Sequence, residues 1–208
     1  MSAGPKPREL SLAALRVVER DGWDGDWQDS VARESGVALA QVMARLPSRE
    51  ALAAAAMAWV LEQLPGEFAD EVDADTPLHL RLYTIVAHEL RAMAPYRNFL
   101  RGLLRDALNP FSATALAQVG NVARYLGFVT EQVRLARTRG EIFSWIPPWS
   151  AAAGFWVLHL RVLVTWLNDS SPKYEDSHAM LDRDLRGFVA MLGGSTRQEE
   201  ANGDVIKP

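Results

Sequence analysis

The sequence predicts an all-α fold. Apolar residues recur at helical spacing along the whole chain, and no stretch of useful length alternates as a half-buried strand would. Glycines, prolines and short polar clusters separate the helical stretches. The 208 residues, 49% hydrophobic and 23% charged, suit one large domain or a small domain joined to a larger one.

Three short helices are expected in the first 50 residues. The first spans about 8–20, with Leu12, Leu15 and Val18 on one stripe. A second begins after Asp26, a residue type that caps helix N-termini, and carries Trp27 inward. Gly36 permits a left-handed turn, and a third helix follows over about 39–46. This order is typical of a helix-turn-helix.

Longer helices follow. Ser48 caps a fourth helix expected to end near Leu64, before Pro65-Gly66. Five more are expected over about 77–93, 96–108, 113–137, 149–167 and 172–192, giving nine in all. The predicted organisation is a helix-turn-helix domain over 1–55, a larger helical domain over 56–194 and a disordered polar tail over 195–208.

Residues 10–55 resemble the tetracycline-repressor (TetR) family of transcriptional regulators. The stretch "VARESGVALAQVMARLPSREAL" is similar to the family pattern "IA...AGVS...LY..F.SKE.L", and Gly36-Val37 and Ser48-Arg49-Glu50 stand at matching positions. The resemblance implies a TetR-like fold with a small helix-turn-helix head on a larger helical body. The chain departs from the pattern at three positions, listed here: Met43 replaces a Tyr that commonly meets a phosphate, Leu46 replaces Phe, and Ala38 replaces a Ser or Thr cap.

A second resemblance covers "WLNDSSPKYEDSHAMLDRDL", residues 166–185. It is similar both to some TetR-like proteins and to TetR-fold accessory proteins of ubiquinone biosynthesis, which hold isoprenoid lipids. Gly22-Trp23 fit the accessory proteins as well. Those proteins typically add an amphipathic membrane-docking helix at the C-terminus, and the ending "GGSTRQEEANGDVIKP" has none.

The resemblance places the DNA contacts on the third helix and just after it. We expect Gln41 and Arg45 to reach base edges, and Ser48 or Arg49 to fix a phosphate. The charge balance opposes tight binding, because the first 50 residues hold seven Lys and Arg against eight Asp and Glu. A helical head that has lost DNA binding therefore stays open as an alternative.

The expected body offers a ligand site and a dimer interface. Aromatic side chains mixed with a few polar groups suit a cavity for a small apolar ligand, although ordinary core packing explains each one separately. The expected lining is Trp59, Tyr83, His88, Met93, Phe99, Leu103, Tyr125, Phe128, Trp156 and His159. The resemblance implies that residues 56–194 form a ligand-binding and dimerisation domain whose last two helices make a four-helix bundle with a second copy. The expected interface residues are Trp149, Ala152, Leu160, Leu163, Leu167, Leu181 and Leu185.

Several classes of site are disfavoured by the sequence. The chain has no cysteine, and no two of its four histidines lie four residues apart, so we expect no metal site and no cofactor. Neither a Gly-rich phosphate loop nor a nucleophile elbow is present, so we expect no enzyme. The apolar stretch 149–167 approaches membrane-spanning length, but His159 and Arg161 near its middle favour a buried helix over stable membrane insertion.

The sequence therefore predicts a cytoplasmic, ligand-responsive transcriptional regulator. It would act as a homodimer that binds operator DNA through its heads and a small apolar molecule in its bodies. The alternative is a non-enzymatic lipid- or isoprenoid-binding protein of the ubiquinone-biosynthesis accessory type, with a head that no longer reads DNA.

Overall fold

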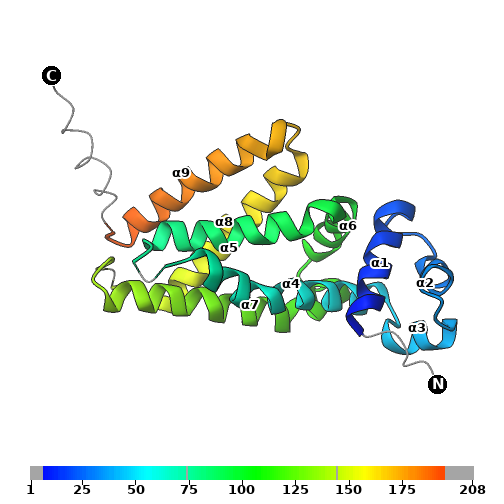
Figure 1. Ribbon diagram of the computed structural model, residues 1–208. Coiled ribbons are helices and arrows are strands. Elements are labelled where there is room, and N and C mark those ends of the chain that lie inside the picture. The colour runs from blue at the N-terminus through cyan, green and yellow to red at the C-terminus, as the bar shows by residue number, and fades with distance from the viewer. Residues whose placement is uncertain (1–6, 74, 144, 195–208) are drawn as a thin grey trace. The chain divides into compact units, whose positions relative to one another are not determined.

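The computed structural model is all-helical, as the sequence predicts. It describes residues 7–73, 75–143 and 145–194, which contain no strand. Figure 1 shows the helices in chain order. Their bounds are α1 Pro7–Asp21, α2 Trp27–Ser35, α3 Leu39–Arg45, α4 Arg49–Glu71, α5 Leu78–Met93, α6 Arg97–Ala107, α7 Ala113–Thr138, α8 Pro148–Asn168 and α9 Glu175–Met191, with 3-10 helices at Ala94–Tyr96 and Pro172–Tyr174.

The chain forms two compact units that are each discontinuous in sequence. The first holds residues 1–65 and 89–124, and the second holds 66–88 and 125–208. Helices α4, α5 and α7 each contribute residues to both units. The predicted division at residue 55 stays a prediction, and the predicted tail 195–208 lies outside the described residues.

The first unit contains the head, made of α1, α2 and α3. Helix α1 packs on α2, and α2 packs on α3 (Figure 1). Leu15, Val31 and Val42, one from each helix, are fully buried. Burial of these apolar side chains stabilises three helices that are each too short to be stable alone.

Helix α6 of the first unit is fixed to α1 and to the loop that follows it. The carboxylate of Glu19 accepts hydrogen bonds from the backbone N–H groups of Asn98 (2.7 Å) and Phe99 (3.1 Å), at the start of α6. Trp23 lies against Phe99 with 5.5 Å between ring centroids, and its indole N–H donates to Asp106 at 2.6 Å. These contacts hold the head on α6.

The second unit is built around α8 and α9, which lie side by side (Figure 1). Phe155, Trp166, Leu181 and Leu185 are buried in its core. Arg81 is also buried, 1% exposed, and its guanidinium pairs with Glu141 at 2.9 Å. This ion pair ties α5 to the segment that follows α7.

The expected end of the fourth helix near Leu64 is wrong, because α4 continues through Pro65 to Glu71. A proline inside a helix removes one N–H donor and crowds the carbonyl four residues earlier, which bends a helix without always ending it.

Two smaller differences lie at helix starts. Asp26 stands at the N-cap of α2 without a side-chain cap hydrogen bond, and a 3-10 turn at Pro172–Tyr174 precedes α9.

Candidate DNA-binding and ligand-binding sites

The turn between α2 and α3 has the geometry of a helix-turn-helix. Gly36 ends α2 with φ of +67°, in the left-handed region that the sequence predicted for it. Ala38 stands at the N-cap of α3 and cannot supply a side-chain cap. Ser48 caps α4 as expected, because its hydroxyl accepts the N–H of Ala51 at 3.2 Å.

The outward face of α3 is mostly apolar. Gln41 and Arg45 are both exposed, so both side chains can reach a partner. Leu39 and Met43 are exposed as well, with exposed fractions of 37% and 50%. Helix α3 therefore offers one amide and one cation within a surface of Leu, Met and Ala, which is sparse for a helix that reads bases.

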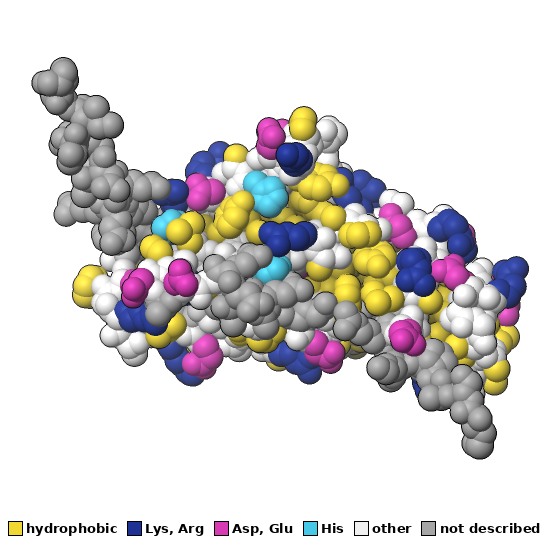
Figure 2. Space-filling view, viewed as in Figure 1, with side chains coloured by type: hydrophobic (Ala, Val, Ile, Leu, Met, Phe, Trp, Pro, Cys, Tyr) yellow, Lys and Arg dark blue, Asp and Glu magenta, His cyan; other side chains and the backbone are white. Residues whose placement is uncertain are grey.

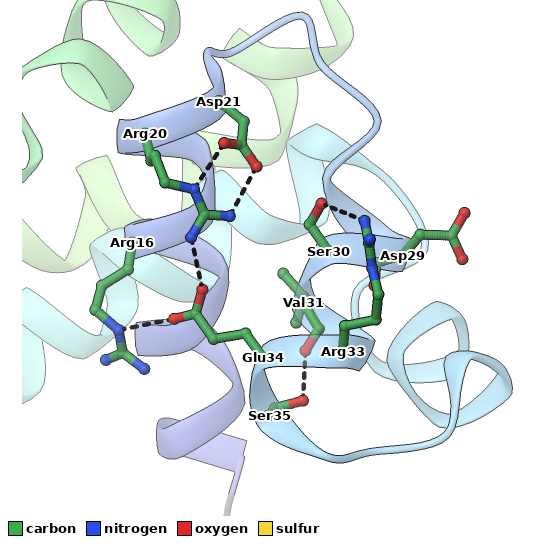
Figure 3. Close-up of polar contacts among 9 residues, drawn as sticks. All are labelled: Arg16, Arg20, Asp21, Asp29, Ser30, Val31, Arg33, Glu34 and Ser35. Atoms are coloured by element: carbon green, nitrogen blue, oxygen red, sulfur yellow. Dashed lines mark hydrogen bonds and ion pairs between the residues drawn. The ribbon is translucent and has the colours of Figure 1, made fainter.

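Arginines of α1 are held by carboxylates of the head (Figure 3). Arg16 and Arg20 both reach Glu34 of α2, at 3.2 and 3.1 Å. Arg20 also donates to Asp21, and this hydrogen bond lowers the pKa of the Asp21 carboxyl below its usual value. Because each arginine pairs with a carboxylate of the head, these cations contribute less to attraction of DNA than their number suggests.

The two residues expected to hold phosphate are also engaged within the head. Ser48 serves as the cap of α4, and hydrogen bonding with Ser48 lowers the pKa of Glu50. Arg49 contacts Asp24, with Nη1 3.4 Å from Oδ1 and Nη2 donating to the backbone oxygen at 3.0 Å. Both border a hollow between the first turns of α2 and α4, also lined by Gly25, Asp26, Trp27, Gln28 and Pro47.

Acidic and basic side chains alternate over the face of the molecule shown in Figure 2. The pattern agrees with the net charge of −4 and with the ion pairs described above. DNA binding by this head would rest on a few correctly placed contacts, because general electrostatic attraction is weak.

Three of the predicted ligand residues come together in the second unit. Tyr125 of α7 stacks on His159 of α8 with 4.9 Å between ring centroids, and Trp156 lies 5.6 Å from Tyr125. Phe155, which the sequence analysis did not single out, extends the group at 6.3 Å from Tyr125. His159 is only 1% exposed. The cluster can form an aromatic wall with polar atoms in it, a chemistry suited to the flat or chain-like part of an apolar ligand.

The other predicted ligand residues divide between the two units. Tyr83 and His178 form a separate pair, with the Tyr83 hydroxyl 2.9 Å from Nδ1 of His178. Phe99 belongs to the first unit, where it packs on Trp23. Trp59, Met93 and Leu103 also belong to the first unit, and His88 and Phe128 to the second. A single ligand site lined by all ten residues stays a prediction.

The predicted dimer residues fall into two groups. Trp149 is exposed and Leu160 is half-buried, so both are available to a partner. The side chains of the other five are buried within the chain's own core; these are Ala152, Leu163, Leu167, Leu181 and Leu185. The apolar stripe that α8 presents outward runs instead through Trp149, Ala153, Val157 and Val164, with Val157 69% exposed.

Helix α8 is long and apolar enough to cross a membrane by length and composition. In the structure only one side of it is buried within the second unit, and Val157 and Val164 on the other side are exposed. Arg161, near its middle, reaches Asp184 of α9 at 3.1 Å. Part of the apolar surface of α8 is therefore buried in the chain's own core.

The main contacts that the sequence analysis missed join distant parts of the first unit. Asp24 binds Arg105, 81 positions later, through both carboxylate oxygens at 3.1 to 3.2 Å. Trp23 fills a notch over Gly102. The glycine inside α6 was the one available signal, since a helix tolerates glycine at a cost unless another group needs the space.

Comparison with known proteins relates the chain to TetR-family regulators through its fold. No protein-family model matches the chain, and no curated protein matches it. A protein from Rhodococcus sp. described as a TetR-family transcriptional regulator superposes with a TM-score of 0.72 at 17% identity, covering 88% of this chain and 97% of its own. The TetR transcriptional regulator of Nitrosomonas europaea gives 0.69 at 16% identity, covering 91% and 98%.

A third structure carries a bound ligand. FadR of Bacillus subtilis, solved in complex with stearoyl-CoA, superposes with a TM-score of 0.69 at 15% identity, covering 89% of this chain and 98% of its own. These alignments span nearly the whole of each chain, so the likeness includes both the head and the body. The chain has the TetR-family fold, which confirms the fold that the sequence resemblance implied.

Proposed function

We propose that the protein is a ligand-responsive transcriptional regulator that acts as a homodimer in the cytoplasm. The observation that carries the proposal is the helix-turn-helix itself. Its left-handed turn at Gly36 and the Ser48 cap leave α3 with Gln41 and Arg45 exposed. The likeness to TetR-family regulators over nearly the whole chain supports it.

In this proposal α3 enters the major groove and few residues carry the recognition. Arg45 pairs with a guanine and Gln41 with an adenine, while Ser48 and Arg49 at the start of α4 hold the adjacent phosphate. Two heads double each phosphate contact. Doubling offsets the low positive charge of one head.

The second copy would pack on the outward stripe of α8. Trp149, Ala153, Val157 and Val164 are exposed and apolar or small, as expected for side chains that a partner helix covers. This stripe replaces the five buried residues of the earlier prediction, whose side chains already fill the chain's own core.

The ligand would be a small, largely apolar molecule that contacts the aromatic cluster of Tyr125, Trp156 and His159. FadR of Bacillus subtilis binds stearoyl-CoA within the same fold, which makes an acyl chain a reasonable first probe. Ligand binding in the body would be coupled to the spacing of the two heads, and through it to DNA binding.

A second candidate function rests on the surface of α3. Exposed Leu39 and Met43, together with the ion-paired arginines of the head, also fit a lipid-binding protein whose head no longer reads DNA. Such a protein would purify with a long apolar molecule in its body and would ignore DNA.

Binding of labelled DNA from the region upstream of the protein's own coding sequence tests the first candidate. We expect fluorescence anisotropy to show binding that weakens steeply as salt rises. Arg45→Ala should weaken binding about 5- to 150-fold, since a bidentate arginine–guanine pair contributes about 1–3 kcal/mol.

Arg91→Ala is the control, because it removes an exposed arginine of α5 outside the helix-turn-helix. Equal binding by both variants would contradict a reading role for α3. Absence of binding at low salt, together with a co-purified lipid found by native mass spectrometry, would favour the second candidate.

A further inference from the structure

Asp24 holds two arginines from two different helices. It lies in the loop between α1 and α2, and its Oδ1 is 3.4 Å from Nη1 of Arg49, the first residue of α4. Both of its carboxylate oxygens contact the guanidinium of Arg105 of α6, at 3.1 to 3.2 Å. One carboxylate therefore receives two guanidinium groups on the surface of the first unit.

The place that Asp24 occupies is suited to a phosphate. Arg49 begins a helix of 23 residues, and a helix start favours anions through its free N–H groups and its dipole. The hollow between the first turns of α2 and α4 opens beside it and is bordered by Asp24, Gln28, Ser48 and Arg49. Paired oxygens bound by guanidinium groups are also how arginine recognises phosphate.

We propose that Asp24 is an internal counter-ion that competes with phosphate for Arg49, so that the head binds a nucleic-acid backbone by exchanging the Asp24 carboxylate for a phosphate group. The inference rests on the proposed DNA-binding function. No covalent step is involved, and the exchange needs no unfolding, because the Asp24 side chain is 66% exposed.

Arg105 is the second partner of the Asp24 carboxylate. When Arg49 turns to a phosphate, Asp24 keeps its second partner and remains charge-compensated. The hydrogen bond from Arg105 lowers the pKa of the Asp24 carboxyl, so it is charged at neutral pH. Ion pairs between exposed groups are weak, so a phosphate held also by a helix start can displace the carboxylate.

The test compares Asp24→Asn with Asp29→Asn. Asp29 is an exposed carboxylate in the first turn of α2, so its replacement makes the same change in net charge in the same head. We expect Asp24→Asn to elute from a heparin column at higher salt than Asp29→Asn. It should also bind a short DNA duplex about 1.5- to fivefold more tightly at equal ionic strength, as the loss of one weak competing pair implies.

Two further variants assign the gain to the arginines. The first is Arg49→Ala, combined with either Asp24→Asn or Asp29→Asn. The two double variants should elute at the same salt, because the gain of Asp24→Asn requires Arg49. The second variant, Arg105→Ala, leaves Arg49 as the one arginine, among the described residues, that Asp24 contacts. It should elute at lower salt than Arg101→Ala, which removes an exposed arginine one turn earlier on α6.

The outcomes separate the inference from the function that it rests on. Equal elution of Asp24→Asn and Asp29→Asn, or a gain that survives Arg49→Ala, would overturn the role of Asp24. Later elution of Asp24→Asn with no duplex binding by any variant would support Asp24 as the counter-ion of an anion site while refuting DNA binding. Far-UV circular dichroism of every variant checks that each one is folded.

Discussion

At the scale of single residues, Trp23 is central to the first unit. It is buried in the loop between α1 and α2, packs on Phe99 and hydrogen-bonds to Asp106. Its ring lies over Gly102, where a Cβ atom would come within 2.3 Å of Trp23 Cγ. Glycine is required at 102 by this close approach and not by an unusual backbone angle.

Gly102→Ala should destabilise the protein. The added methyl must displace a buried indole, and overpacking of this kind costs about 1–3 kcal/mol. Urea denaturation should report a lower free energy of unfolding for this variant. Gly120→Ala on α7 is the matched control, because a Cβ there meets no atom within 4 Å and alanine favours the helix by up to about 1 kcal/mol. Equal effects of the two changes would show that Trp23 does not occupy the notch.

Individual residues also show what could be predicted from the sequence. Gly36 and Ser48 were predictable, because a left-handed turn and a helix cap depend on neighbours in the chain. The link from Asp24 to Arg105 spans 81 positions. Such a contact is set by how α6 packs on α1, and one sequence carries no local pattern for it.

At the scale of elements, most helix boundaries could be predicted from local chemistry. The boundary at Met93 agrees with the structure, where α5 ends and a 3-10 helix over Ala94–Tyr96 takes in Pro95. The expected end at Pro65 is wrong, since α4 runs through it. The helical stripes were predictable, but the side of α8 that faces outward was not, because both sides of this helix are apolar.

The start of α9 depends on one carboxylate. Asp169 accepts hydrogen bonds from the N–H and hydroxyl of Ser171 through Oδ1, at 2.8 and 2.6 Å, and from those of Ser177 through Oδ2, at 2.9 and 2.5 Å. These bonds, led by the Ser171 hydroxyl, hold the pKa of Asp169 well below its usual value of 3.8. Asp169 thereby joins the end of α8 to the first turn of α9.

Asp169→Ala should lower the melting temperature at neutral pH. Because the folded-state pKa is depressed, the stabilisation is complete above the ordinary pKa and is lost as pH falls from 3.8 toward the folded value. The difference in melting temperature between wild type and variant should therefore be constant from neutral pH to about pH 5 and shrink below about pH 4. Asp176→Ala, in the first turn of α9, is the control and should have a smaller effect. A difference that grows on acidification would contradict this role.

At the scale of the whole molecule, the proposed function needs two heads at a fixed spacing. The TetR-family fold is shown by likeness over nearly the whole chain, while the dimer and its DNA are proposals. A homodimer with two-fold symmetry binds two inverted half-sites, and their centres lie about 34–36 Å apart, one turn of DNA, or a multiple of that. A ligand that changes the head spacing would then release the DNA.

Selection of DNA from a random-sequence pool by the purified wild-type protein tests this central claim most directly. We predict enrichment of an inverted repeat whose half-sites are separated by one helical turn or a multiple of it, with guanine and adenine at the positions that Arg45 and Gln41 read. A pool that shows no enriched sequence at low salt would contradict a reading head and would leave the helix-turn-helix of this chain as a structural element alone.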